Sequence, residues 1–177
     1  MPATHIALLR GINVGTAKRV PMADLRELFE GLGYTGVATL LNSGNVVFTA
    51  KRDSAGKIEG KIEQAIEKRF GFGSRVTVIT AEELSAIVKE NSLGADNHSR
   101  LLVAVLKTSG DRTKIAPLAG RDWGTGRLAL GKRCAYMWCP DGLLDSPLAA
   151  EVGRALGDAV TTRNWATVLK LQALVER

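Results

Sequence analysis

Residues 37–49 read Val-Ala-Thr-Leu-Leu-Asn-Ser-Gly-Asn-Val-Val-Phe-Thr. The runs at 37–42 and 45–49 are rich in residues that favour β-strands, and only Ser43 and Gly44 separate them. Two β-rich runs with a two-residue connection of this kind predict a β-hairpin. Together with the helices and strands predicted on either side of it, the hairpin defines the order of elements along the chain.

The segments on either side of the hairpin predict one helix and one strand each. Upstream, residues 5–9 form a short apolar run typical of a buried strand, and residues 21–32 carry apolar side chains at helical spacing. Downstream, residues 58–70 show the helical pattern again, and residues 75–79 predict a further strand. The resulting order, β-α-β-β-α-β, is that of the ferredoxin-like unit.

The same order begins again in the second half of the chain, after a helix that Thr80 and Glu83 predict as a capping box. We expect a strand at 101–106, a helix at 111–118, a hairpin of 128–130 with 134–139, a helix capped by Ser146, a short segment at 159–160 that can be a final strand, and a terminal helix opened by 161–165. The fold class is therefore α+β, with two ferredoxin-like halves (βαββαβ-type) packed into one compact body and an extra C-terminal helix. We expect residues 1–91 to form the first half with its linking helix, and residues 92–177 to form the second.

The composition is that of a soluble globular protein, because 45% of the 177 residues are apolar and 24% are charged. The longest apolar runs are far too short to cross a bilayer, and the segment from Met1 to His5 lacks the basic residues of a signal peptide. We therefore expect a cytoplasmic location and no membrane partner. Lys and Arg outnumber Asp and Glu by 24 to 18, and the resulting net charge of +6 favours acidic ligands without identifying one.

The two cysteines, Cys134 and Cys139, stand five residues apart in a predicted strand. Because side chains alternate along a strand, their sulfur atoms should lie on opposite faces, where they can neither pair nor share a metal ion. His5 and His98 are the only histidines in the sequence. We therefore expect free thiols, no metal site and no cofactor.

Two short polar segments stand where helices are predicted to begin. The first is Arg10-Gly11-Ile12-Asn13-Val14-Gly15, which continues through Lys18 and Arg19 to a helix at Pro21, and the second is Thr161-Thr162-Arg163-Asn164-Trp165. A helix N-terminus carries a partial positive charge, so a cation there costs about 0.3–1 kcal/mol unless something negative lies nearby. The glycine spacing matches neither the Walker phosphate loop nor the dinucleotide fingerprint. The two segments therefore predict an anion site of another kind.

We predict a cationic pocket between the first loop, the hairpin and the start of the terminal helix. Its expected ligand is small and anionic, either phosphate-bearing or nucleotide-like, and is held by side-chain donors. The predicted ligand-binding residues are Arg10, Asn13, Lys18, Ser43, Asn45, Arg163 and Asn164. No cluster of histidines or paired carboxylates accompanies them in the sequence, so no catalytic residue is identified.

Three motifs in this order and spacing resemble a bacterial family, the domain of unknown function numbered sixteen ninety-seven. They are residues 8–15 (Leu-Leu-Arg-Gly-Ile-Asn-Val-Gly), 43–48 (Ser-Gly-Asn-Val-Val-Phe) and 162–168 (Thr-Arg-Asn-Trp-Ala-Thr-Val), the last followed by Lys170-Leu171. The resemblance covers about residues 5–174 and implies a compact α+β fold with repeated ferredoxin-like halves. It implies no activity, substrate or catalytic residue. Thr16 and Ala166 depart from the family pattern, which tends to have Gly and Asn at these positions.

The same residues allow other interpretations. Turn chemistry alone explains residues 42–45, Trp165 suits a core position, and Arg163 could pair with Asp158. A basic ferredoxin-like protein could instead bind nucleic acid on its sheet, although Phe48 is the one aromatic residue of the third predicted strand. An enzyme of unknown transfer or hydrolysis type, and a purely structural or oligomerising protein, are the remaining alternatives.

Overall fold

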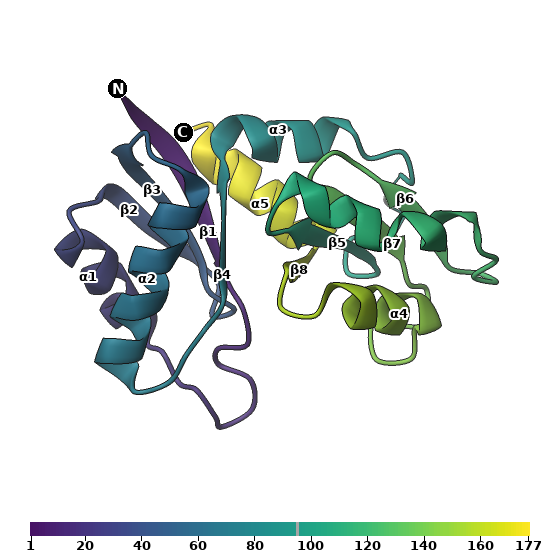
Figure 1. Ribbon diagram of the computed structural model, residues 1–177, viewed down its shortest axis with the longest axis horizontal. Helices are drawn as coiled ribbons and strands as arrows, with labels where there is room; N and C mark the ends of the chain where they lie inside the picture. Colours follow the sequence, from purple (N-terminus) through teal and green to yellow (C-terminus); the bar gives the residue numbers. More distant parts are fainter. Residues whose placement is uncertain (95) are drawn as a thin grey trace. The chain divides into compact units, whose positions relative to one another are not determined.

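The computed structural model describes residues 1–94 and 96–177. This part of the chain divides into two compact units: unit 1 holds Met1–Glu82 with Ala173–Arg177, and unit 2 holds Glu83–Gln172. Each unit contains one four-stranded antiparallel sheet with helices (Figure 1). The predicted α+β class is therefore confirmed. The division into halves at residues 1–91 and 92–177 stays a prediction.

Unit 1 has the element order that the sequence predicts. Its elements are β1 (Pro2–Leu9), α1 (Met22–Gly31), β2 (Thr35–Leu40), β3 (Asn45–Lys51), α2 (Ala55–Phe70) and β4 (Val76–Thr80). The strand order in the sheet is β2-β3-β1-β4, so that β3 and β1 lie at its centre. α1 begins directly after Pro21, and α2 ends at Gly71, whose left-handed φ of 78° closes the helix.

The connection between β2 and β3 is longer than the sequence predicts. β2 ends at Leu40 and β3 begins at Asn45, so residues 41–44 form the turn instead of Ser43 and Gly44 alone. The side chain of Asn45 explains the difference, because its buried amide donates hydrogen bonds to the Leu40 carbonyl (2.8 Å) and to Ser43 Oγ (3.0 Å). A side chain at the base of the hairpin thus closes the turn in place of a tight two-residue connection.

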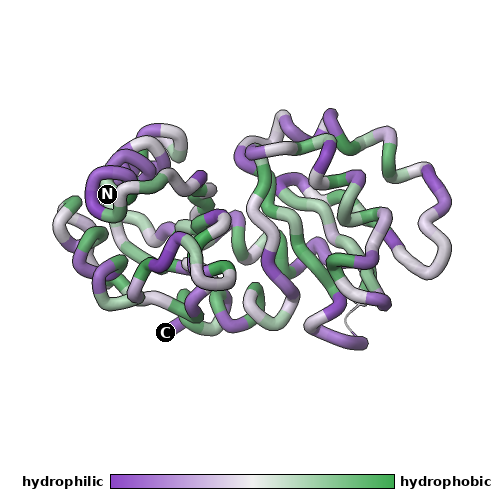
Figure 2. Tube along the Cα trace, turned by 90° about the horizontal axis from the view of Figure 1, so that it is seen from below, coloured by the Kyte–Doolittle hydropathy of each residue, from purple (hydrophilic) through white to green (hydrophobic). Residues whose placement is uncertain are grey.

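The core of unit 1 lies between one face of the sheet and the helices α1 and α2. Alternate residues of the central strands share this face, as strand geometry requires, and the helices contribute residues at helical spacing. Figure 2 shows green, hydrophobic stretches running through the interior of each unit. The core residues of unit 1 include Ala7, Leu9, Leu25, Phe29, Val46, Phe48, Ile58, Ile62 and Ile66.

Two glutamates of α2 cover the outer edge of β4. Glu59 and Glu63 stand one helical turn apart and therefore share a face of the helix. Glu59 Oε1 accepts a hydrogen bond from the Val78 N–H (2.9 Å), and Glu63 Oε1 accepts one from the Val76 N–H (3.0 Å). β4 is the last strand of the sheet, so these carboxylates bind amide groups that point away from the neighbouring strand β1.

Unit 2 contains a second sheet with the corresponding strand arrangement, in the order β6-β7-β5-β8. The elements of this part of the chain are α3 (Ala81–Lys89), β5 (Leu101–Leu106), the 3-10 helices η1 (Ser109–Lys114) and η2 (Ala116–Gly120), β6 (Arg127–Leu130), β7 (Cys134–Trp138), α4 (Pro147–Leu156), β8 (Val160–Asn164) and α5 (Trp165–Val175). The start of α3 and the end of α5 fall in the sequence range of unit 1. As predicted, Ser146 caps α4, because its Oγ accepts a hydrogen bond from the Ala149 N–H (3.0 Å).

The prediction of one helix at residues 111–118 is correct only in part. Two 3-10 helices, η1 and η2, take its place, with Ile115 between them. Pro117 gives one reason, because it has no N–H to continue an α-helix and disfavours the helical conformation at the residue before it. At the start of the segment, Asp111 Oδ2 accepts hydrogen bonds from the Thr108 N–H and hydroxyl (both 3.1 Å), which favours a short capped turn.

The prediction that residues 161–164 open the terminal helix is wrong. These residues belong to β8, where Arg163 pairs with Val103 of β5. The β-branched residues that precede Arg163 favour a strand. Asn164 ends the strand and caps α5, since its Oδ1 accepts a hydrogen bond from the Thr167 N–H (2.9 Å). Because Arg163 lies on a strand, the unfavourable charge at a helix start no longer supports a ligand role for it.

The two cysteines are free and buried. As predicted, their side chains lie on opposite faces of the sheet, because residues five positions apart along a strand point in opposite directions. Cys139 belongs to the core that β5 and β7 form with α4 and the 3-10 helices. Cys134 lies beside Gly131 and Tyr136, and burial raises the pKa of its thiol to about 12. Both thiols are therefore packing groups of unit 2 at neutral pH.

Candidate functional site

The loop between β1 and α1 is closed on itself by hydrogen bonds. The Asn13 N–H donates to the Lys18 carbonyl (3.0 Å), and the Ala17 N–H donates to the Val14 carbonyl (3.3 Å). The side chain of Asn13 spans the base of the loop, because its Oδ1 accepts from the Val20 N–H (2.8 Å) and its Nδ2 donates to the Val20 carbonyl (3.0 Å). The side-chain amide of Asn13 therefore makes, with the N–H and the carbonyl of Val20, the two hydrogen bonds that a neighbouring strand would make in a sheet.

The hairpin turn between β2 and β3 is fastened to this loop. Asn13 Nδ2 also donates to the Asn42 carbonyl (2.7 Å), and the Leu9 N–H donates to the Gly44 carbonyl (2.9 Å). Gly44 has a φ of 90°, and a Cβ atom built on it would lie 2.8 Å from both Leu9 Cβ and Ile12 Cδ1. A side chain at this position would clash, so glycine is required. The motifs at residues 8–15 and 43–48 thus come together within unit 1.

The two loops hold every non-glycine residue with a positive φ in the described part of the chain: Asn13 (53°), Lys18 (51°) and Leu41 (59°). Asparagine tolerates this conformation, whereas for leucine and lysine it costs roughly 1–2 kcal/mol. Strained backbone of this kind persists only where the surrounding structure enforces it, and it collects at functional sites. The strain marks the pair of loops as a candidate site.

A shallow cavity of about 310 Å³ opens beside the two loops, and its lining consists of Asn13, Arg19, Val20, Pro21 and Asn42. The cavity reaches the N-terminus of α1, where Pro21 is the N-cap residue and no side chain caps the helix. Helix N–H groups and a guanidinium both attract negative charge. A cavity of this size suits a small molecule.

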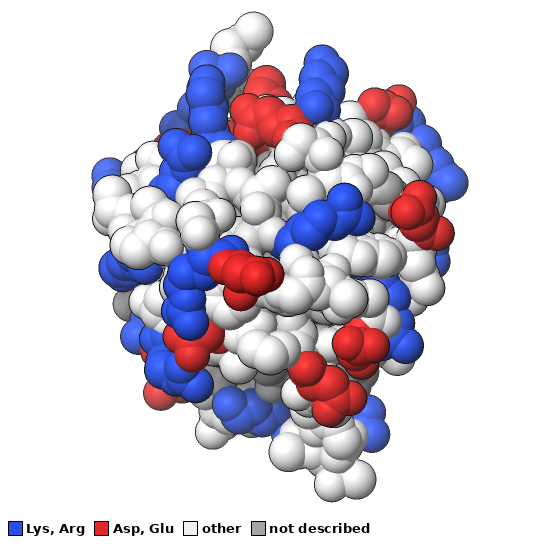
Figure 3. Space-filling view, turned by 90° about the vertical axis from the view of Figure 1, so that its right-hand side faces the viewer, with Lys and Arg blue, Asp and Glu red and all other residues white. Residues whose placement is uncertain are grey.

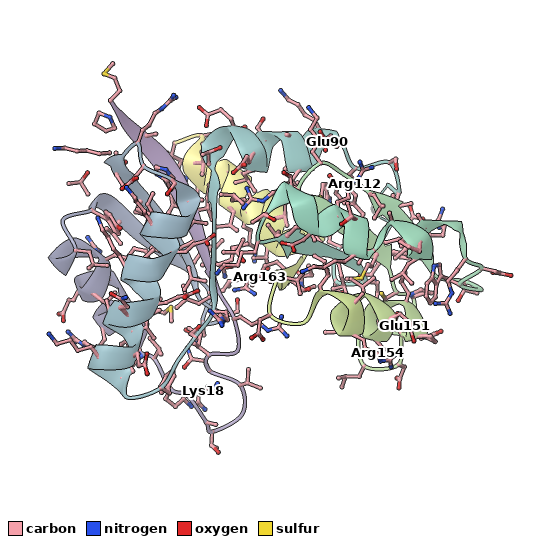
Figure 4. All side chains as sticks on the ribbon, in the orientation of Figure 1. Lys18, Glu90, Arg112, Glu151, Arg154 and Arg163 are labelled. Carbon is pink, nitrogen blue, oxygen red and sulfur yellow. The ribbon has the colours of Figure 1, made fainter. Side chains whose placement is uncertain are left out.

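The five predicted ligand-binding residues of unit 1 have different surroundings. Asn13 lines the cavity, and Lys18 is exposed on the loop after β1 (Figure 4). Ser43 is exposed on the hairpin turn, whereas Arg10 is half-buried directly after β1. Asn45 is fully buried and holds the turn together. Asn13 and Asn45 therefore have structural roles, and the part of all five residues in ligand binding stays a prediction.

Arg163 and Asn164 belong to unit 2. Arg163 lies on β8 (Figure 4), and its guanidinium donates a hydrogen bond to the Thr162 carbonyl (3.0 Å). Burial lowers the pKa of Arg163 to about 10, so the group is protonated at neutral pH. The side-chain oxygen of Asn164 accepts hydrogen bonds from the Thr167 N–H (2.9 Å) and hydroxyl (3.0 Å). A ligand role for these two residues stays a prediction.

Sequence reasoning missed four of the lining residues, Arg19, Val20, Pro21 and Asn42. Two of them carry a signal, because Arg19 stands just before the proline at the helix start and Asn42 begins the Asn-Ser-Gly-Asn turn. Val20 carries none, since a single apolar residue before a helix is typical of core packing. The closure of the loop by Asn13 brings these residues to one opening.

The described residues include no group of three or more His, Cys, Asp or Glu side chains that could hold a metal ion. Within the same residues, no helix is both long and apolar enough to span a membrane. On the face that Figure 3 shows, Lys and Arg side chains are interspersed with Asp and Glu. Nucleic acids are bound mainly by continuous basic surfaces, so this face does not favour a nucleic-acid partner.

Comparisons with known proteins identify the family. A solved structure, that of conserved bacterial protein SP0830 from Streptococcus pneumoniae, matches with a TM-score of 0.77 at 23% sequence identity over 99% of each chain, which supports the fold. No curated protein matches the chain. The family model described as a protein of unknown function (DUF1697) matches residues 3–136, a range that includes the motifs at 8–15 and 43–48. Because this match covers well over half of the sequence, the chain belongs to the DUF1697 family of proteins of unknown function.

Proposed function

We propose that unit 1 binds a small anionic ligand, phosphate-bearing or nucleotide-like, in the cavity at the start of α1. The observation that carries the proposal is the position of Arg19, which lines a cavity of about 310 Å³ beside a helix N-terminus without a side-chain cap. An anion there would meet a guanidinium, which can donate two parallel hydrogen bonds to phosphate or carboxylate. It would also meet the positive end of the helix macrodipole.

The construction of the cavity wall supports the proposal. Asn13 ties the loop to Val20 and to the hairpin turn at Asn42, so little ordering of the loop is needed when a ligand enters. Lys18, the residue before Arg19, adds a second positive charge to the same loop. The net charge of +6 also favours the approach of anions.

Titration of the full chain with inorganic phosphate in a calorimeter tests the proposal. Arg19→Gln removes the charge but keeps a polar side chain, and we expect Kd to rise about tenfold or more, since a hydrogen bond to a charged group contributes roughly 1.5–3 kcal/mol. Arg112→Gln is the matched control, because Arg112 is exposed on η1 of unit 2 (Figure 4) and its loss changes the net charge equally. Equal affinities of the two variants, or no phosphate binding by the parent chain, would contradict the proposal.

We also propose that both units have the ferredoxin-like fold. The support is the β-α-β-β-α-β order of unit 1 and the strand order of each sheet, in which the first and third strands are central. In unit 2, η1 and η2 stand in the chain position of the first helix. A cytoplasmic location agrees with the two free, buried cysteines, since free thiols are typical of reducing compartments.

A further inference from the structure

A second cavity of about 310 Å³ lies within unit 2, beside the loop that connects η2 to β6. Two arginines line it, Arg121 directly after η2 and Arg127 at the start of β6. Leu93 and Leu128, both half-buried, belong to the same lining. One opening of a size that suits a small molecule therefore combines two positively charged residues with an apolar part.

Hydrogen bonds hold this loop in one path. The Trp123 indole N–H donates to the Leu118 carbonyl (3.0 Å), and the Gly126 N–H donates to the Trp123 carbonyl (3.1 Å). Asp122 also lines the cavity, but its carboxylate is a partner of the loop's own backbone, because Oδ1 accepts a hydrogen bond from the Gly124 N–H (2.9 Å). The loop therefore needs little ordering when a ligand binds.

Both arginines have side-chain donors to offer a ligand. The Arg121 guanidinium lies over the Trp123 ring, 4.7 Å from its centroid, and its ion pair with Glu151 spans 3.9 Å, which exceeds a hydrogen-bond length. A guanidinium that stacks on an aromatic ring keeps its N–H groups at its edge, where they can bind an oxyanion. Among the described residues, the Arg127 side chain has no ion pair and no hydrogen bond. Two such groups at one opening raise the local concentration of anions.

We propose that this cavity is a second ligand site, in which Arg121 and Arg127 bind the phosphate group of a small phosphate monoester. A guanidinium donates two parallel hydrogen bonds to phosphate. Near neutral pH a phosphate monoester carries close to two negative charges, which matches two arginines, whereas a monocarboxylate carries one. The apolar lining of Leu93 and Leu128 suits the organic part of the ester. Every lining residue belongs to unit 2, so the site does not depend on the cavity at the start of α1.

Calorimetric titration of the full chain with methyl phosphate and with acetate tests the inference, in an Arg19→Gln background that removes the charged residue of the other cavity. We expect methyl phosphate to bind at least tenfold more tightly than acetate, because it engages both arginines. Adding Arg121→Gln or Arg127→Gln should raise the Kd for methyl phosphate about tenfold or more. Arg112→Gln is the matched control, because it removes an exposed arginine of η1 and should leave this Kd unchanged.

Tryptophan fluorescence provides a second measurement, because all three tryptophans belong to unit 2 and Trp123 lies against Arg121. Methyl phosphate should change this fluorescence with the same Kd, and Trp123→Phe should remove most of the change. Lack of methyl phosphate binding in the Arg19→Gln background, equal Kd values for Arg121→Gln and Arg112→Gln, or equally tight binding of acetate would each overturn the inference. None of these results decides the proposed function, which the comparison of the parent chain with Arg19→Gln tests.

Discussion

The replacement of Gly44 by alanine tests how the two loops of unit 1 are joined. A Cβ atom at this position would lie 2.8 Å from Leu9 Cβ and from Ile12 Cδ1, so the backbone or the core must shift. The φ of 90° adds a conformational cost of roughly 1–2 kcal/mol for an L-residue. Overpacking in a well-packed region typically costs about 1–3 kcal/mol. We therefore expect Gly44→Ala to lower the free energy of unfolding by about 2–5 kcal/mol.

Two other glycines separate these costs. Gly15 has a φ of 59° but no atom within 4 Å of a Cβ built on it, so Gly15→Ala should lose only about 1–2 kcal/mol. Gly60 lies inside α2 without a positive φ and with the same open space, so Gly60→Ala should stabilise by about 0.5–1 kcal/mol. Gly15→Ala therefore tests strain alone, Gly60→Ala tests helix propensity alone, and Gly44→Ala combines strain with close contact.

Urea unfolding is the assay for this series. Far-UV circular dichroism follows the secondary structure of both units, whereas Trp123, Trp138 and Trp165 all belong to unit 2 and report on that unit through their fluorescence. We expect Gly44→Ala to shift the dichroism transition to lower urea more than Gly15→Ala does. If the two variants lose the same stability, the close approach of Gly44 to Leu9 and Ile12 contributes nothing and the reasoning is refuted.

Three further predictions concern side chains with well-defined partners. Asn13→Ala should cost about 1–3 kcal/mol and speed hydrogen exchange of the Val20 amide, and unchanged exchange would contradict the role of Asn13 in closing the loop. Arg133→Met should lower the free energy of unfolding by urea by about 2–3 kcal/mol, because the half-buried guanidinium of Arg133 is paired with the Glu83 carboxylate at 2.6 Å. A decrease below about 0.5 kcal/mol would show that the pair behaves as a surface ion pair. The raised thiol pKa of Cys134, about 12 against an ordinary value of 9.0, means that the unfolded chain loses this proton first, so stability should fall between pH 9.0 and about 12. The contribution reaches at most about 1.4 kcal/mol per pH unit, and parallel pH profiles for the parent and Cys134→Ala would contradict it.

The elements of unit 1 were predictable because each of them carries a local signal. Apolar periodicity marks α1 and α2, and Pro21 and Gly71 mark a start and an end. In unit 2, the two predictions that the structure corrects differ from it for different reasons. Ile115 and Leu118 have helical spacing, but Pro117 prevents a continuous α-helix between them. At residues 161–164, pairing with β5 decides the structure, and no local pattern reveals a partner so far away in the sequence.

The candidate site was predictable only in part. Asn13 and the turn that contains Ser43 were identified from their residue types, and the structure brings their loops together. The place of Arg19 on the cavity wall depends on the path of the loop, which the two hydrogen bonds between the Asn13 side chain and the Val20 backbone determine. The sequence contains the residues that close this loop, but it does not show the path that the closed loop takes. Arg163 was chosen from helix electrostatics, and its place on β8 removes that reason.

The carboxylates of Glu59 and Glu63 also affect how this protein can self-associate. An open strand edge is a template on which a second chain can add a strand, and repeated addition leads to fibrils. At β4, an incoming strand would have to displace both carboxylates from the Val76 and Val78 amides and bring its own carbonyl oxygens toward their negative charge. The two glutamates therefore oppose polymerisation of the chain through this edge.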